Sequence, residues 1–183
     1  MFLGWVTRLF IAINLNDKTK KELLALRDEL RSHAERGSFS FPENLHLTLA
    51  FLDECDAKQT AAAKAAMDSV SFEPFELLIE RVGRFGGRGG NEQAQSEAIW
   101  WAGVQACEPL LVLHSRLTDN LIAAGFILDR RKYSPHITLG RRVVSDAAPR
   151  RIEPFGETVR KIDLMKSERI DGKLTYTPIY RSH

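Results

Sequence analysis

The clearest alternation of apolar and polar positions in the chain is NLHLTLAF, residues 44–51. Successive side chains of a strand point to opposite faces, so the leucines would share one face and His46 and Thr48 the other. The pattern predicts a strand whose leucine face lies in the core. Strands with one solvated face carry polar residues as a matter of course, so a single copy does not indicate a functional site.

Apolar residues at helical spacing predict three further segments as helices. They lie at about 17–33, 56–70 and 108–124. Asp56 and Gln59 have the spacing of a capping box at the start of the second helix. Nearly continuous apolar runs predict buried strands at 9–15, 75–85 and 99–105.

Glycine and proline indicate the connections between these elements. A loop with Gly37 and Pro42 is predicted before the strand with His46. The run GGRGGNEQ at 86–93 lacks the Gly-Lys-Ser/Thr of a phosphate-binding P-loop, so we expect a mobile connector. Alternating residues on both sides of Asp171-Gly172 predict a hairpin near the end of the chain.

The order of strand, helix, loop and polar-faced strand occurs twice. In PHITLGR, His136 and Thr138 repeat the spacing of His46 and Thr48, 90 residues further along. Burial explains the apolar positions in both copies, but it does not require the same outward polar pair twice. The repeat therefore favours a functional role for the pair.

We expect two lobes related by an approximate two-fold axis within a single domain. The predicted domain spans 1–183, with approximate repeats 8–85 and 98–180.

Composition limits the class of protein. A chain of 183 residues that is 44% hydrophobic and 27% charged suits one soluble globular domain. The net charge of +2 does not by itself indicate nucleic-acid binding, although basic residues outnumber acidic ones between Arg130 and Lys161. The two cysteines are far apart and predict a reducing, cytoplasmic environment. The apolar N-terminal run is interrupted by Arg8 and is too short to span a bilayer, so we expect no membrane association.

Two histidines and two threonines that meet across a cleft would suit acid–base chemistry. One imidazole can be neutral while the other is charged, because the ordinary pKa of histidine is near neutrality. One histidine then takes a proton from a nucleophile and the other gives a proton to a leaving oxygen. Threonine hydroxyls can donate hydrogen bonds to the non-bridging oxygens of a phosphodiester.

Arg141 is a candidate for binding the phosphate charge. It follows His136 by five residues, and an odd spacing on a straight strand places the two side chains on opposite faces. Its participation requires a bend or the end of the strand.

Other chemistries fit the sequence less well. Zinc takes three or four compactly arranged ligands, and His46 has no recognised partner pattern nearby. No HExxH occurs, and no serine stands in a GxSxG elbow. We expect neither a metal nor another cofactor.

The two motifs HLTL and HITL resemble the paired H-x-T-x signature of the 2H phosphoesterase superfamily. With RLFIAINL, YSPHITLGR and LMKSERIDGKLTYTPIY, nearly the whole chain is similar to the RNA 2′,3′-cyclic phosphodiesterases, also called 2′-5′ RNA ligase-like proteins. The resemblance implies a bilobed α+β fold in which two antiparallel β-sheets face each other across a central cleft, with helices outside.

The resemblance also implies an activity and a role for each residue. The expected reaction is metal-independent hydrolysis of a terminal RNA 2′,3′-cyclic phosphate to a 2′-phosphomonoester. His46 would be the proton donor and His136 the proton acceptor, with Thr48 and Thr138 on the phosphate oxygens and Arg141 near the phosphate. Reversal with a ribose hydroxyl would give 2′-5′ ligation.

Neighbouring residues extend the predicted RNA contact. Phe41 and Tyr133 precede the two histidines closely and are candidates for stacking on the terminal base. Arg130 is a candidate for following the RNA backbone. We expect a monomer with RNA ending in a 2′,3′-cyclic phosphate as its partner, and no obligate protein partner.

Two alternatives remain open from the sequence. The same chemistry would serve a small cyclic nucleotide, in which case the length of an RNA would not affect the rate. A non-catalytic RNA- or nucleotide-binding module would not need all four motif residues, and all four are present.

Overall fold

The computed structural model describes residues 6–88, 95–129 and 131–183. These residues form an α+β fold of two antiparallel sheets and three α-helices, as the sequence predicted. The strands are β1 (Thr7–Asn14), β2 (Ala34–Phe39), β3 (His46–Cys55), β4 (Phe75–Arg88), β5 (Gln95–Val104), β6 (His136–Ser145), β7 (Arg150–Val159), β8 (Ile162–Ile170) and β9 (Lys173–Ser182). The helices are α1 (Asp17–Ser32), α2 (Ala57–Asp68) and α3 (Glu108–Ala123), with a short 3₁₀ turn at Pro42–Asn44.

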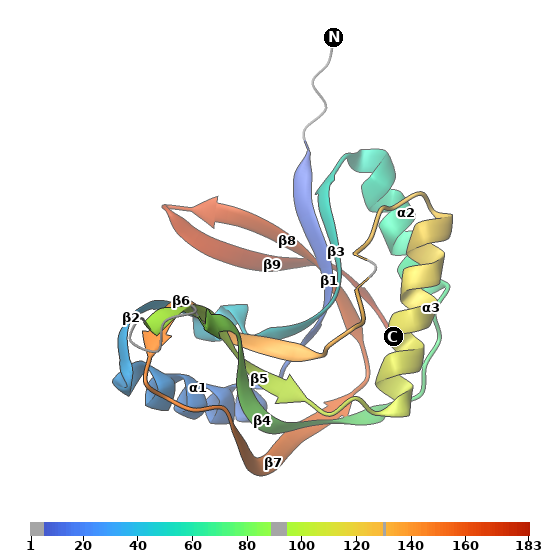
Figure 1. The fold of residues 1–183 in the computed structure, drawn as a ribbon. Helices are drawn as coiled ribbons and strands as arrows, with labels where there is room; N and C mark the ends of the chain where they lie inside the picture. Colours follow the sequence, from blue (N-terminus) through green and yellow to red (C-terminus); the bar gives the residue numbers. More distant parts are fainter. Residues whose placement is uncertain (1–5, 89–94, 130) are drawn as a thin grey trace.

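The two sheets have corresponding strand orders. The four-stranded sheet has the order β3-β1-β8-β9, and the five-stranded sheet has β2-β6-β5-β4-β7. Each histidine strand pairs with the buried strand that precedes it in the sequence, β3 with β1 and β6 with β5. Figure 1 shows the sheets as two layers, with α1 against the five-stranded sheet and α2 beside α3.

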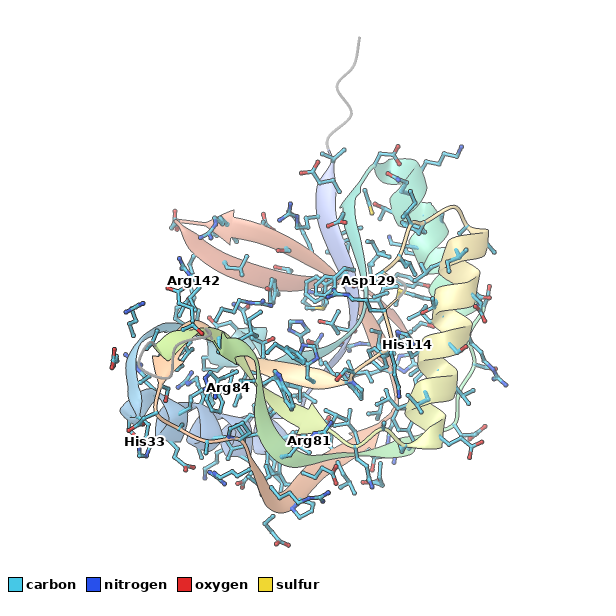
Figure 2. All side chains as sticks on the ribbon, viewed as in Figure 1. His33, Arg81, Arg84, His114, Asp129 and Arg142 are labelled. Atoms are coloured by element: carbon cyan, nitrogen blue, oxygen red, sulfur yellow. The ribbon has the colours of Figure 1, made fainter. Side chains whose placement is uncertain are left out.

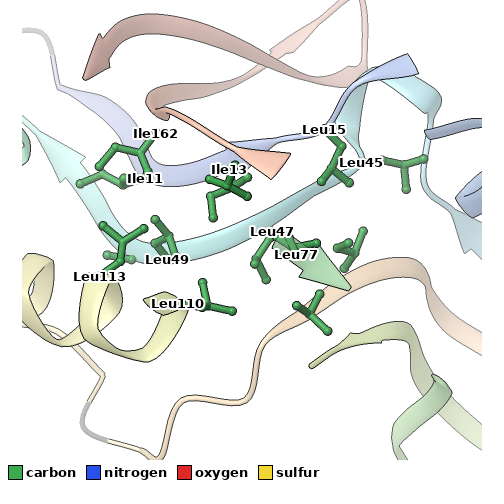
Figure 3. Close-up of a cluster of buried hydrophobic side chains, with 14 of the residues drawn as sticks. Ile11, Ile13, Leu15, Leu45, Leu47, Leu49, Leu77, Leu110, Leu113 and Ile162 are labelled. Carbon is green, nitrogen blue, oxygen red and sulfur yellow. The ribbon is translucent and has the colours of Figure 1, made fainter. Parts of the chain in front are cut away.

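One apolar core continues through both sheets and the helices. Leu47 and Leu49 of β3 are buried in it together with Ile13 of β1 and with Leu110 and Leu113 of α3 (Figure 3). Because side chains alternate along a strand, burial of the leucines directs the intervening polar side chains to the opposite face. The first four residues of β3 and β6 have the same alternation of half-buried and buried positions.

Local sequence signals are confirmed at several element ends. The capping box is present at the start of α2, where Asp56 accepts from the backbone N–H of Gln59 at 2.7 Å and Gln59 accepts in return. Asp171 and Gly172 connect β8 to β9 with φ of 49° and 77°. Positive φ at both central residues is the geometry that the Asp-Gly pair predicts for a tight hairpin.

Neither edge strand of the five-stranded sheet was predicted as a strand from the sequence. The segment around Gly37 was expected to be a loop, but residues 34–39 form β2 and pair with β6. A Cβ on Gly37 would lie 2.8 Å from Cγ2 of Val143, so glycine permits this close approach. The other edge, β7, contains Pro154, which an edge strand tolerates because one side of its backbone remains unpaired.

The glycine-rich connector falls partly outside the described residues. Its first residues, 86–88, belong to β4 rather than to a loop, and residues 89–94 lie outside the described part of the chain. Within the described residues, no helix is long and apolar enough to cross a membrane.

Candidate active site

The two histidine side chains are held in the same way. Nδ1 of His46 lies 2.7 Å from the carbonyl oxygen of Asn44, and Nδ1 of His136 lies 2.7 Å from that of Ser134. A carbonyl oxygen only accepts hydrogen bonds, so Nδ1 carries a proton in both rings. Each neutral ring is therefore the Nδ1–H tautomer, with the lone pair on Nε2. Nε2 is the atom that can accept or deliver a proton in both halves of the molecule.

The start of each strand produces this geometry. Each histidine is the first residue of its strand, and the residue two positions earlier precedes the regular pairing. On the β3 side, Asn44 closes the 3₁₀ turn, and its side-chain amide donates to the carbonyl of Leu174 at 2.9 Å. This bond ties the carbonyl that orients His46 to the terminal hairpin.

His46 is half-buried among aromatic rings of its own sheet. Its ring centroid lies 4.9 Å from that of Phe10 and 5.2 Å from that of Tyr176, and its Nε2 lies 3.0 Å from Oγ1 of Thr48. Burial lowers the pKa of His46 from the ordinary 6.5 to about 4, against the opposing effect of the carbonyl of Asn44. In the free protein His46 is therefore neutral at pH 7.

His136 also has aromatic neighbours from its own sheet, which is the five-stranded one. Its ring centroid lies 5.1 Å from Phe85 of β4 and 6.3 Å from Trp101 of β5. Phe85 and Trp101 also contact each other, with centroids 5.1 Å apart. The two histidines thus lie against different aromatic pairs, one from β1 and β9 and the other from the adjacent strands β4 and β5.

The two sheets bring their histidines close enough to influence each other. The positive charges of Arg141 and His136 both help to lower the pKa of His46, after burial. Tyr133, just before β6, donates its hydroxyl to the backbone carbonyl of Thr48 at 3.0 Å and so joins the two histidine strands directly. Strands β3 and β6 are also in contact.

A bulge resolves the spacing problem of Arg141. From Thr138 to Gly140, β6 advances two residues while its partner strand advances one, so Leu139 and Gly140 are both buried and Arg141 returns to the face of His136. A second irregularity follows between Gly140 and Val143, where Arg142 has a positive φ of 51°. A bulge bends the strand and interrupts the alternation of its faces. The charge of Arg141 acts on His46 of the opposite sheet as a result.

The remaining predicted site residues differ in their placement. Thr138 is half-buried two residues after His136, on the same face of the strand. Tyr133 is stacked on His114, with centroids 3.7 Å apart and planes at 9°, so one face of its ring is already covered. Phe41 is 46% exposed, and Nζ of Lys173 lies 4.1 Å from its centroid. One face of the Tyr133 ring is therefore closed to a base, whereas the ring of Phe41 borders solvent.

Arg130, the remaining candidate, lies outside the described residues. Among the described residues, no group of three His, Cys, Asp or Glu side chains is placed to hold a metal ion.

Four aromatic neighbours of the histidines were not predicted from the sequence, namely Phe10, Phe85, Trp101 and Tyr176. They come from four strands, and only the pairing register places them beside a histidine. Cross-strand pairing of Trp101 with Thr138 is the signal for one of them, but it requires the register to be known.

Two strands that each present a histidine and a threonine, with an arginine close enough to lower the pKa of His46, are the arrangement of a paired-histidine phosphoesterase. The sequence model of the LigT-like phosphoesterases matches residues 13–93. A relative from Archaeoglobus fulgidus, named RNA 2′,3′-cyclic phosphodiesterase, is 31% identical over 134 residues, which are 73% of this chain and 72% of the relative. The chain belongs to the LigT-like phosphoesterase family.

Further similarities extend over nearly the full length. A Thermotoga maritima protein of the same name is 28% identical over 95% of this chain and 91% of its own length. The crystal structure of Escherichia coli LigT complexed with 3′-AMP matches with a TM-score of 0.80 and 25% identity, over 97% of this chain and 98% of that one. The described residues therefore have the fold of LigT.

Proposed function

We propose that this enzyme hydrolyses the 2′,3′-cyclic phosphate at the end of an RNA to a 2′-phosphomonoester. The observation that carries the proposal is the matched pair of histidines, each with Nδ1 fixed by a carbonyl so that Nε2 is the atom that exchanges a proton, together with Arg141 near His46. A cyclic phosphodiester needs a base for the attacking water, an acid for the leaving oxygen and a cation for the phosphate.

The proposed reaction uses these groups as follows. Nε2 of His136 accepts a proton from water, and the water oxygen forms a bond to phosphorus. The bond from phosphorus to the ribose 3′ oxygen breaks, and Nε2 of His46 donates a proton to that oxygen. Thr48 and Thr138 donate hydrogen bonds to the non-bridging oxygens, and Arg141 neutralises their charge. Solvent then restores the proton to His46 and removes it from His136.

The low pKa of His46 sets a condition on this scheme. A ring with a pKa of about 4 is neutral at pH 7 and cannot donate a proton from Nε2 until it gains one. An anionic phosphate bound beside the ring favours the charged imidazolium and raises the pKa. Substrate binding therefore supplies the protonated form of His46, while the carbonyl of Asn44 stabilises the charge at Nδ1.

The repeated architecture belongs to the same proposal. Residues 8–85 and 98–180 act as two lobes of one catalytic domain, each contributing one histidine and one threonine. With a ribose hydroxyl in place of water at the reverse step, the same groups would form a 2′-5′ linkage.

The proposal is tested by incubating the protein in EDTA with a short RNA that ends in a 2′,3′-cyclic phosphate and mapping the product. A 2′-phosphate end is the expected result. A 3′-phosphate end would reverse the assignment of the leaving oxygen. Loss of activity in EDTA that a divalent ion restores would overturn the metal-independent scheme. If only cyclic mononucleotides react, a small cyclic nucleotide becomes the substrate, and if nothing reacts, the binding-module alternative gains support.

A further inference from the structure

The open face of the five-stranded sheet carries an unbroken cross-strand row that begins at His136. His136 is paired with Gly103 of β5, Gly103 with Arg81 of β4, and Arg81 with Arg151 of β7. Residues directly opposite each other in antiparallel strands point to the same face. The row therefore places two arginines on the face of the histidine, two and three strands away, or about 10 and 14 Å at the usual strand spacing.

The side chain of Arg81 lies along this row toward the histidine strand. A Cβ built on Gly103 would lie only 2.6 Å from Cγ and 2.6 Å from Nε of Arg81. The arginine thus lies flat over a position where the sheet has no side chain. The same Cβ would be 2.9 Å from the ring of Trp101, which confirms that Trp101 and Arg81 share this face.

The ring of Trp101 contacts the guanidinium of Arg81 on the open face of the sheet. The guanidinium carbon lies 5.6 Å from the ring centroid, within the range of a cation–π contact. The Trp101 ring in turn lies flat over Gly83, whose Cβ would be 2.3 Å from it. A stacked guanidinium is held in place while the N–H donors at its edge stay free for an anion.

Both arginines of the row lack acidic partners within the described residues. No ion pair or hydrogen bond to a carboxylate is formed there by Arg81 or Arg151, and both side chains are exposed. Like charges directly opposite each other in a sheet are destabilising, so the Arg81–Arg151 pair has an energetic cost in the free protein. A bound anion would remove that cost.

The neighbouring arginines show that this arrangement is not general to β4 and β7. Arg150 bonds Glu29 of α1 at 2.6 Å, on the opposite face of the sheet. The guanidinium of Arg84 lies 5.7 Å from the ring of Trp100, which is fully buried, and so it also belongs to the opposite face. Figure 2 shows Arg81 and Arg84 along the β4 strand.

We infer that Arg81 and Arg151 form a second phosphate-binding subsite, which holds the sugar–phosphate backbone of the nucleotides that precede the cyclic end of an RNA. The inference rests on the proposed function, because it takes the reactive phosphate to lie at the histidines. A cyclic mononucleotide has no phosphate for this subsite, whereas an oligonucleotide has one for each preceding linkage. The row makes the enzyme selective for a chain over a mononucleotide.

The test compares two substrates with the same reactive end, uridine 2′,3′-cyclic phosphate and a short RNA that ends in the same nucleotide. We expect the wild type to have the higher kcat/KM on the RNA. Arg81→Gln should reduce that preference about tenfold, mainly through KM, because it removes charge-assisted hydrogen bonds from the longer substrate only. The slope of log kcat/KM against log salt concentration for the RNA should decrease by about 1, as expected for the loss of one phosphate contact.

Two further variants separate charge from structure. Arg81→Lys should retain part of the preference, because it keeps the charge but loses the planar fork. Arg150→Gln is the matched control, since the residue has the same chemistry, adjoins Arg151 and points to the other face. It should keep the wild-type preference, and circular dichroism should show that all variants are folded.

The outcomes distinguish the subsite from the proposed function. If Arg81→Gln and Arg150→Gln both keep the wild-type preference, or if Arg81→Gln lowers kcat/KM equally on both substrates, the subsite is overturned. If the wild type converts neither substrate, the proposed function fails. The subsite is then judged by fluorescence anisotropy with the RNA, where equal affinities of the wild type and Arg81→Gln would overturn it.

Discussion

The two sheets place the same motif in unlike surroundings. In the four-stranded sheet, His46 is enclosed by Phe10 and Tyr176, contacts Thr48, and has a pKa lowered to about 4 by burial. In the five-stranded sheet, His136 opens onto a face that carries Arg81 and Arg151. The carbonyl two residues before each histidine fixes the tautomer of its ring, and burial beside aromatic rings keeps His46 neutral.

The same contrast appears five residues after each histidine. This position is Arg141 in β6 and Phe51 in β3, and Phe51 is 62% exposed. The proposed reaction places one phosphate between the two histidines and needs one strong cation there, and only β6 has an arginine at this position. The difference indicates that a twofold pattern in sequence has become two distinct roles, one ring enclosed and one beside the positive charges.

Removing either histidine is expected to have the largest effect. His46→Ala and His136→Ala should each reduce kcat/KM on a cyclic-phosphate RNA by about 10³-fold, because each removes one proton-transfer step. Their combination should be far from multiplicative, since the two groups act in one transition state. Steady-state kinetics measures both, and His33→Ala, at the exposed end of α1, is the control that should keep full activity.

A substrate with sulfur at the 3′ bridging position distinguishes the roles. A thiolate leaves without a proton, so this substrate should restore much of the activity of His46→Ala but not that of His136→Ala. Rescue of His136→Ala instead would exchange the donor and acceptor roles of the two lobes.

Arg141→Gln should have the next largest effect, a loss of about 10²-fold in kcat/KM, because a charge-assisted contact to the phosphate is lost. It should also raise the pKa of His46, since the charge of Arg141 is one of the causes that lower it. The kcat/KM profile reports pKa values of the free enzyme, and the lower value sets its acidic limb. With a pKa of about 4 for His46, that limb should lie near pH 4 in the wild type. It should move to higher pH in the variant.

Arg142→Gln is the matched control for this prediction, because it changes the adjacent arginine, which is also exposed. An acidic limb that stays in place in Arg141→Gln would show that Arg141 does not act on His46.

The sequence predicted the elements whose burial is periodic. Leu47 and Leu49 fix which face of β3 enters the core, and the same rule places His46 and Thr48 together. The edge strand at 34–39 was missed because its side chains are mostly exposed, so no alternation of buried and exposed positions marks it. Its pairing with β6 depends on the space above Gly37, which is a tertiary property.

The protonation of the site was also beyond sequence reasoning. Phe10 and Tyr176 are separated by most of the chain and meet His46 only through the register of β1 and β9 with their neighbours. The bulge before Arg141 contains Gly140, but a single glycine does not locate a bulge until the register of β6 with β5 is known. Both features follow from strand pairing.

The enclosed histidine should also make stability depend on pH. The pKa of His46 is about 4 in the folded protein, below the ordinary 6.5, so protonation favours the unfolded chain. Stability from this group is complete above pH 6.5, falls as the pH decreases toward 4, and changes no further below it. The maximum loss is about 3 kcal/mol. Thermal unfolding across this range should show a smaller decline in His46→Gln than in the wild type, and parallel curves would contradict the low pKa.

The smallest expected effect concerns the hydrogen bond from Tyr133 to Thr48, which joins the two histidine strands. Tyr133→Phe removes the hydroxyl that donates to the carbonyl of Thr48, and it leaves the stack on His114 intact. Loss of one such hydrogen bond should lower the free energy of unfolding by about 1 kcal/mol, measured by urea denaturation. Because the bond sets the position of β3 relative to β6, kcat should fall several-fold while KM changes little. If Tyr133→Phe loses this much stability but keeps the wild-type kcat, the two histidine strands keep their relative position without this bond.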